Sequence, residues 1–255
     1  MNWGDYDHYG YAAIALVGTF VAAGGLLWLM VRSRHAGLLR SFHGVVPPFI
    51  NIVGVLFALT LAFLANDTWN AHDRAINTVY READSLNSLK ALALKLPRAT
   101  AERVDTAIDA YARSVVEIEW PLLGQRRSSP EAALRFGTLL GVLSGDDVAS
   151  SAGASVHALM LAQAIDVRDG RELRIALSQT HVNPLKWLGM AFLGFLTMAS
   201  VAIVHVEAPR AAFAAVMLFA VSAAPTAAIV LVQGNPFQHP SIVASTPIAG
   251  VYGPR

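Results

Sequence analysis

Long apolar runs alternate with charged segments along the chain. None of these runs contains Asp, Glu, Lys or Arg, and each is close to the roughly 20 residues that an α-helix needs to cross a hydrocarbon layer of about 30 Å. Buried helices of a soluble protein are a poor alternative, because several such runs without polar faces would leave little surface for water. We therefore expect four transmembrane helices, over Tyr11–Val31, Val45–Ala65, Trp187–Val204 and Ala211–Val232.

The first apolar run does not have the features of a cleavable signal peptide. The ten residues before it carry Asp5 and Asp7 but no Lys or Arg, and the run is longer than the usual apolar core of such a peptide. We expect this helix to remain in the mature protein.

Charge is concentrated between the second and third runs, where Asp67–Pro184 holds 15 of the 18 acidic and 13 of the 19 basic residues. Apolar residues recur there at helical spacing, and Gly54 is the only helix-breaking residue between Asn51 and Leu96. The second transmembrane helix is therefore expected to continue out of the bilayer and to end at Pro97.

Further helices are expected in this charged segment. One covers Ala101–Trp120. Ser129 is a suitable N-cap for a second that begins at Pro130, and Asp146 or Asp147 can cap a third. The segment is thus predicted to be a helical extramembrane domain.

The expected fold class is all-α, with this domain inserted between transmembrane helices 2 and 3. Residues 1–66 hold transmembrane helices 1 and 2, residues 67–184 the extramembrane domain, continuous with helix 2, and residues 185–232 helices 3 and 4. Residues 233–255 form a tail with four prolines and no charge before the last residue. Its composition allows either an ordered coil laid on the bundle or on a neighbouring chain, or a floppy tail.

Composition supports a membrane protein and excludes several kinds of chemistry. The chain is 55% hydrophobic and 15% charged, against about 45–50% and 25% in soluble domains. A net charge of +1 gives no reason to expect a nucleic-acid partner. The absence of cysteine removes disulfides, thiolate metal sites and cysteine nucleophiles.

No motif for catalysis, a metal or a cofactor is found, so we expect none of these and no enzyme activity. Asp67, His72 and Asp73 are poorly spaced for one metal ion on a helix, and Glu117 and Glu119 face apart. Surface or inter-helix salt bridges are the better interpretation of this glutamate pair. Acidic or amide residues at a membrane surface could still act without a motif.

The second transmembrane helix carries the most informative pattern. Gly54, Ala58 and Ala62 follow one another at four-residue intervals, which gives a face where another helix can approach closely. Around an oligomer axis, a second face could provide an aromatic constriction and an acidic mouth. Ordinary bundle packing, with the Thr60 hydroxyl bonded to its own backbone, is the alternative. The pore-lining candidates are Asn51, Phe57, Thr60, Phe63, Leu64 and Asp67.

Four stretches carry a family resemblance: Gly54–Phe63 (GVLFALTLAF), Arg81–Leu86 (READSL), Tyr111–Pro121 (YARSVVEIEWP) and Asn235–Phe237 (NPF). Together they make the chain similar to the bacterial bestrophin-like membrane protein family, which resembles the bestrophin channels more distantly. That resemblance implies a multi-pass protein of the bacterial inner membrane and a homo-oligomer, specifically a pentamer, with helix 2 lining the pore. The lipid bilayer and inorganic ions would then be its partners.

Two features depart from this resemblance. The family usually has an acidic residue shortly before the Pro-Phe pair, where this chain has Gly234. Bestrophins keep the large insert in the cytoplasm, whereas Arg32, Arg34 and Arg40 in the first short loop favour that loop as the cytoplasmic side. The orientation therefore stays open.

Two functions follow as hypotheses. The first is an oligomeric ion channel. The alternative is a non-conducting membrane scaffold or sensor that acts through its helical extramembrane domain.

Overall fold

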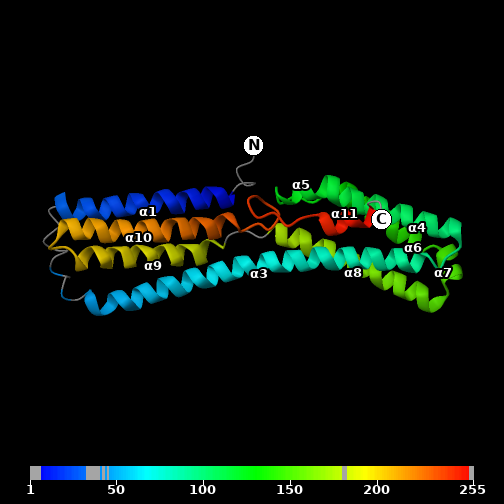
Figure 1. Ribbon diagram of the computed structural model, residues 1–255, viewed down its shortest axis with the longest axis horizontal. Coiled ribbons are helices and arrows are strands. Elements are labelled where there is room, and N and C mark those ends of the chain that lie inside the picture. The colour runs from blue at the N-terminus through cyan, green and yellow to red at the C-terminus, as the bar shows by residue number, and fades with distance from the viewer. Residues whose placement is uncertain (1–6, 33–40, 42–43, 45, 180–182, 253–255) are drawn as a thin grey trace. The chain divides into compact units, whose positions relative to one another are not determined.

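The computed structural model describes residues 7–32, 41, 44, 46–179 and 183–252, and in this part of the chain all regular elements are helices (Figure 1). The predicted all-α fold class is confirmed. The chain divides into two compact units. We call Met1–Trp69 with His181–Gly234 the transmembrane unit, and Asn70–Thr180 with Asn235–Arg255 the extramembrane unit.

The transmembrane unit contains α1 (Asp7–Arg32), α9 (Pro184–Val204), α10 (Pro209–Val232) and the first half of α3 (Pro47–Ala93). Among the described residues, four helices are long and apolar enough to cross a membrane, and they correspond to the four predicted runs. Helix α10 lies between α1 and α9 (Figure 1). Small side chains such as Ala212 and Ala220 are fully buried there, which lets these helices approach closely.

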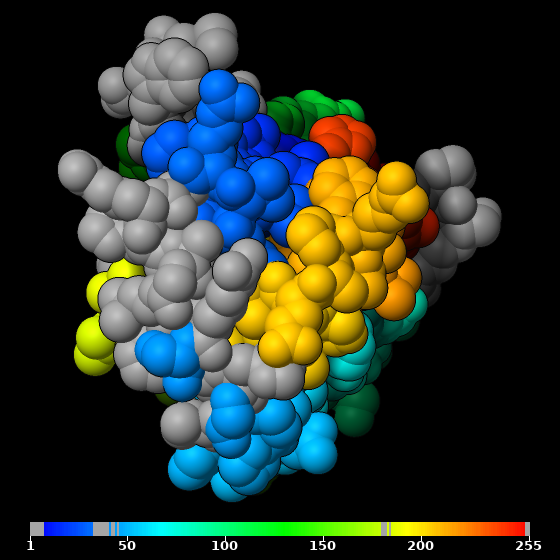
Figure 2. Space-filling view, turned by 90° about the vertical axis from the view of Figure 1, so that its left-hand side faces the viewer, coloured from blue at the N-terminus to red at the C-terminus, as the bar shows by residue number. Residues whose placement is uncertain are grey.

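Helix α3 passes without interruption from the transmembrane unit into the extramembrane unit. It ends at Ala93, close to the expected stop at Pro97. The space-filling view in Figure 2 shows its first turns, in light blue, at the margin of the face presented there. Within the transmembrane unit it packs on its neighbours mainly through Phe57, Leu61 and Leu64.

The extramembrane unit is a bundle of helices around one core. Ser129 caps α6 as predicted, because its hydroxyl accepts a hydrogen bond from the amide of Ala132 at 3.2 Å. Besides the second half of α3, its elements are α4 (Arg98–Ser114), the π-helix η2 (Val115–Glu119), α5 (Trp120–Leu123), α6 (Pro130–Leu143), α7 (Asp146–Ala152), α8 (Ala154–Ser178) and α11 (Thr246–Tyr252).

One local prediction in this unit is wrong. The N-cap of α7 is Gly145, without a side-chain bond, and neither Asp146 nor Asp147 takes that place. The expected helix over Ala101–Trp120 is present, and its last part includes the π-helical segment Val115–Glu119. Gly153 separates α7 from α8 with a φ of +73°, a conformation that glycine adopts without strain.

The C-terminal tail is ordered in the described residues and includes a short helix. Phe237, Val243 and Ile248 are buried in the core of the extramembrane unit. The indole of Trp120 donates a hydrogen bond to the carbonyl of Val243 at 3.1 Å, and the Asn235 amide donates to a backbone carbonyl. The ordered coil that composition allowed is therefore found over residues 233–245, whereas Thr246–Tyr252 forms α11, which packs against α4 and was not expected.

Candidate functional site

One face of α3 is held inside the chain's own transmembrane bundle. The Phe57 ring packs against the Phe219 ring, with centroids 5.6 Å apart, and lies directly against Gly194. Leu64 is buried with Met190. Two of the predicted pore-lining residues, Phe57 and Leu64, therefore contact α9 and α10 in the single chain.

The other pore-lining candidates lie toward the outside of this bundle. Phe63 is 68% exposed, and Asn51 and Asp67 are exposed as well. Thr60 is half-buried, and its hydroxyl donates to the Leu56 carbonyl at 2.7 Å, which is the backbone bond considered as an alternative. The structure thus separates the six candidates into an inner pair and an outer set of four.

The stripe of small residues runs from the bundle onto the outer surface of α3. Gly54 is half-buried and faces Thr197, with 3.9 Å between a Cβ built at position 54 and the threonine methyl. Ala58 and Ala62 are exposed. In the single chain these two alanines form a surface of small side chains that none of the described helices covers.

Asp67 has a basic partner at the end of the membrane span. The Lys186 ammonium lies 2.8 Å from its carboxylate, and both side chains are more than half exposed. The two charges cancel locally, so in the single chain Asp67 belongs to an acid–base pair and is not an isolated acidic group. Among the described residues no group of three or more His, Asp or Glu side chains is placed to hold a metal ion.

A second candidate site lies in the core of the extramembrane unit, where Arg174 of α8 is fully buried. Its guanidinium donates to both carboxylate oxygens of Glu82, at 2.9 and 3.0 Å, and to Glu119 at 3.2 Å. It also lies over the Trp120 ring, 5.2 Å from the centroid. Bidentate pairing of this kind fixes the direction of both partners as well as their distance.

The π-helix supplies the second acid of this cluster. Glu119, at its end, is fully buried and also accepts from Arg171 at 2.6 and 3.1 Å and from the Ser129 amide at 3.0 Å. Glu117 instead faces outward and is 3.8 Å from Arg113. The inter-helix salt bridge expected for this pair is confirmed for Glu119. π-Helical turns are rare and occur frequently at functional sites.

Tyr111 completes the cluster by donating its hydroxyl to Glu82 at 2.7 Å. Burial, followed by the charge of Glu82, raises the pKa of Tyr111 well above its ordinary value. Burial alone would lower the pKa of Arg174, but the charge and hydrogen bonds of Glu82 raise it above the ordinary value. The cluster is therefore a neutral phenol and two arginine–glutamate pairs, and each buried charge has an opposite partner.

The cluster of Arg174, Glu82, Glu119 and Tyr111 was not predicted from the sequence. Glu82 and Tyr111 lie in stretches that carried the family resemblance, but no role was given to either. A signal was present, because Glu82 falls within the apolar stripe of α3 between Val79 and Leu86. Its partner Arg174 lies 92 residues away, so only the fold identifies the pair.

Tyr111→Phe tests the electrostatics of the cluster. Because the folded state raises the Tyr111 pKa, the wild type loses stability as pH rises above about 10, where the unfolded chain ionises first. The variant should lose about 1.5–3 kcal/mol at neutral pH and show a shallower alkaline decline. Thermal unfolding of both proteins between pH 8 and 11 measures this. If the stability of the wild type and of the variant fell equally steeply between pH 8 and 11, the expected titration of Tyr111 would be contradicted.

The arrangement of helices can be compared with known proteins. A sequence profile described as the Bestrophin-like domain matches residues 17–248. The chain belongs to the bestrophin-like family. It is a multi-pass membrane protein, and the resemblance noted from the four sequence stretches is confirmed.

Solved structures share the fold of this bestrophin-like chain at low sequence identity. A crystal structure of a membrane protein aligns with a TM-score of 0.69 at 12% identity, over 95% of this chain and 96% of the other. A variant of a bacterial bestrophin homologue from Klebsiella pneumoniae aligns with a TM-score of 0.65 at 13% identity, over 94% of each chain. No protein of curated function is similar enough in sequence to count as a match.

The position where this chain departs from the family pattern has a local explanation. A Cβ atom at Gly234 would collide with the imidazole ring of His8, which is buried in the same unit. An acidic side chain at this position would therefore require the His8 ring, or the start of α1 that carries it, to shift. The glycine permits the close approach of the chain to the start of α1.

Proposed function

We propose that this bestrophin-like protein is a passively conducting ion channel of the bacterial inner membrane rather than an enzyme. Several copies, five by resemblance to the family, surround an axis, and the transmembrane half of α3 from each copy lines the pore. The lipid bilayer and inorganic ions are its partners. The observation that carries the proposal is that α3 buries only one narrow face in its own bundle and leaves its outer candidates uncovered.

The exposed surface of α3 supports an oligomer. Ala58 and Ala62 offer the small-residue face on which a second helix packs closely in a membrane. The Asn51 side chain is exposed and forms no hydrogen bond with any residue that the structure describes. Polar groups in membrane helices usually face a bundle interior or water. A neighbouring copy on one side and a wet axis on the other would satisfy both features.

The paired charges at the span end lead to a prediction about ion selectivity. Lys186→Met removes the base and leaves the carboxylate of Asp67, so cation permeability relative to anion permeability should increase. Asp67→Asn leaves the ammonium and should shift the ratio the opposite way. Reversal potentials under a salt gradient in planar bilayers measure both shifts. Equal potentials in the two variants would place this pair outside the ion path.

A non-conducting scaffold or sensor remains the competing function. It would use the extramembrane unit to bind a partner, and large apolar side chains such as Leu94, Leu134 and Leu159 are exposed there. This function needs no symmetric ring and no response of ion flux to α3 substitutions. The experiments on α3 therefore distinguish the two.

A further inference from the structure

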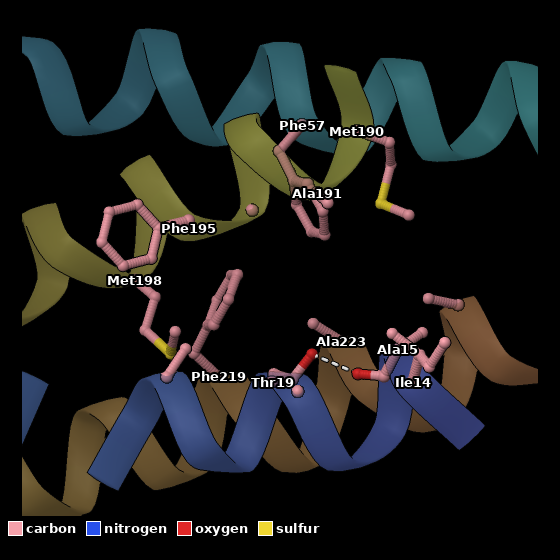
Figure 3. A pocket seen from close by; sticks show the side chains of 14 residues that line it. Ile14, Ala15, Thr19, Phe57, Met190, Ala191, Phe195, Met198, Phe219 and Ala223 are labelled. Carbon is pink, nitrogen blue, oxygen red and sulfur yellow. Dashed lines mark hydrogen bonds between the residues drawn. The ribbon is translucent and has the colours of Figure 1, made fainter. Parts of the chain in front are cut away.

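The transmembrane unit contains a cavity of about 310 Å³ that the proposed pore does not use (Figure 3). Side chains from α1, α3, α9 and α10 all line it. Its volume falls within the roughly 300–1,000 Å³ range typical of ligand sites.

The cavity lies at the middle depth of the membrane spans. Its lining includes Gly18 near the midpoint of α1, Gly194 at the midpoint of α9 and Phe219 near the midpoint of α10. At this depth the surrounding solvent is the hydrocarbon of the lipid chains, far from either headgroup layer. The cavity is therefore in contact with apolar solvent.

The described lining residues include no charged group and a single hydroxyl. That hydroxyl belongs to Thr19 and donates to the Ala15 carbonyl at 2.7 Å, drawn as a dashed line in Figure 3. The rings of Phe57 and Phe219 and the thioether of Met198 form much of the remaining wall. Water needs two to four polar partners in such a space, and apolar cavities stay dry. An apolar occupant matches this surface.

The cavity reaches the surface of the unit between α1 and α9. Ile14 of α1 and Phe195 of α9 line it and are 68% and 45% exposed, and Gly18 and Ala191 beside them are exposed too. We propose that this cavity binds the terminal part of a lipid acyl chain, which enters from the bilayer between α1 and α9. The site is independent of whether the protein conducts ions.

The test uses the full-length protein in vesicles of a phosphatidylcholine that carries a diazirine near the end of one acyl chain. After irradiation, mass spectrometry locates the adducts. Met198 is 2% exposed and lines the cavity, whereas Phe192 on the same helix faces outward. We expect adducts on both residues. Adducts on Phe192 without any on Met198 would overturn the proposal.

Matched variants separate entry into the cavity from general contact with lipid. Ala15→Leu and Ala223→Leu each fill part of the cavity from a different helix and should abolish the Met198 adduct while Phe192 stays labelled. Ala13→Leu adds the same side chain to an exposed position of α1 and should change neither adduct. Unchanged labelling of Met198 in both filling variants would refute the acyl-chain site. Labelling of Met198 by a small aromatic diazirine, but not by the diazirine-bearing lipid, would refute it as well.

Discussion

Replacing Arg174 by Met is expected to lower the free energy of unfolding by about 3–5 kcal/mol, the largest stability effect predicted for any single change in the extramembrane unit. The substitution leaves Glu82 fully buried without its bidentate partner and removes one of the donors to Glu119. Thermal unfolding of the full-length protein should show a fall in Tm of roughly 6–20 °C.

Arg168→Met provides the matched control. It lies six residues away on α8, is exposed, and among the described residues it pairs with Asp169 and Glu172 of its own helix. Exposed pairs contribute about 0–1 kcal/mol, so this variant should unfold close to the wild type. Equal losses of unfolding free energy in Arg174→Met and Arg168→Met would show that the buried cluster does not stabilise the extramembrane unit as proposed. Adding Glu82→Gln to Arg174→Met should recover part of the loss, because it removes the uncompensated charge.

Phe63→Ala is expected to increase ion flux several-fold in reconstituted vesicles. In the proposed oligomer this exposed ring projects from α3 toward the axis and narrows the pore with an apolar constriction, which conducts poorly because water leaves it. Removing the ring should widen the pore at this constriction and allow water to fill it. A fluorescence assay of ion uptake, at equal protein per vesicle and with oligomer size checked, measures the change.

Phe57→Ala separates a constriction from general loosening of the bundle. Its ring packs against Phe219 and Gly194 in the same chain, so its loss should reduce thermal stability with little direct effect on flux. An increase in flux for Phe57→Ala but not for Phe63→Ala would reverse the assignment of the two faces. Unchanged flux in both variants, with intact oligomers, would remove α3 from the pore.

The sequence was sufficient for the fold class because membrane spans leave a strong local signal. Four uncharged runs located α1, the first half of α3, α9 and α10, and the cap at Ser129 located the start of α6. Local signals of this kind need only neighbouring residues. The helix in the tail was missed because its burial depends on packing against segments that are distant in the sequence.

The candidate sites were harder to predict than the fold class, because a sequence pattern does not show which neighbour a helix face contacts. Helical periodicity shows that Phe57 and Leu64 share a face, but it does not show whether that face meets α9 and α10 or a neighbouring copy. The structure places both residues against their own bundle. Likewise, the sequence shows Glu82 only as one charged residue on a long helix. Its pairing with Arg174 of another helix is visible only in the folded structure.

The most direct test of the account is the oligomeric state and symmetry of the detergent-solubilised protein. Native mass spectrometry would give the number of copies, and two-dimensional particle averages would give their arrangement. We expect a closed ring in which α3 of every copy faces the axis and Phe63 lies nearer to the axis than Phe57. A monomer or dimer, or a ring with α3 on its lipid-facing perimeter, would contradict it.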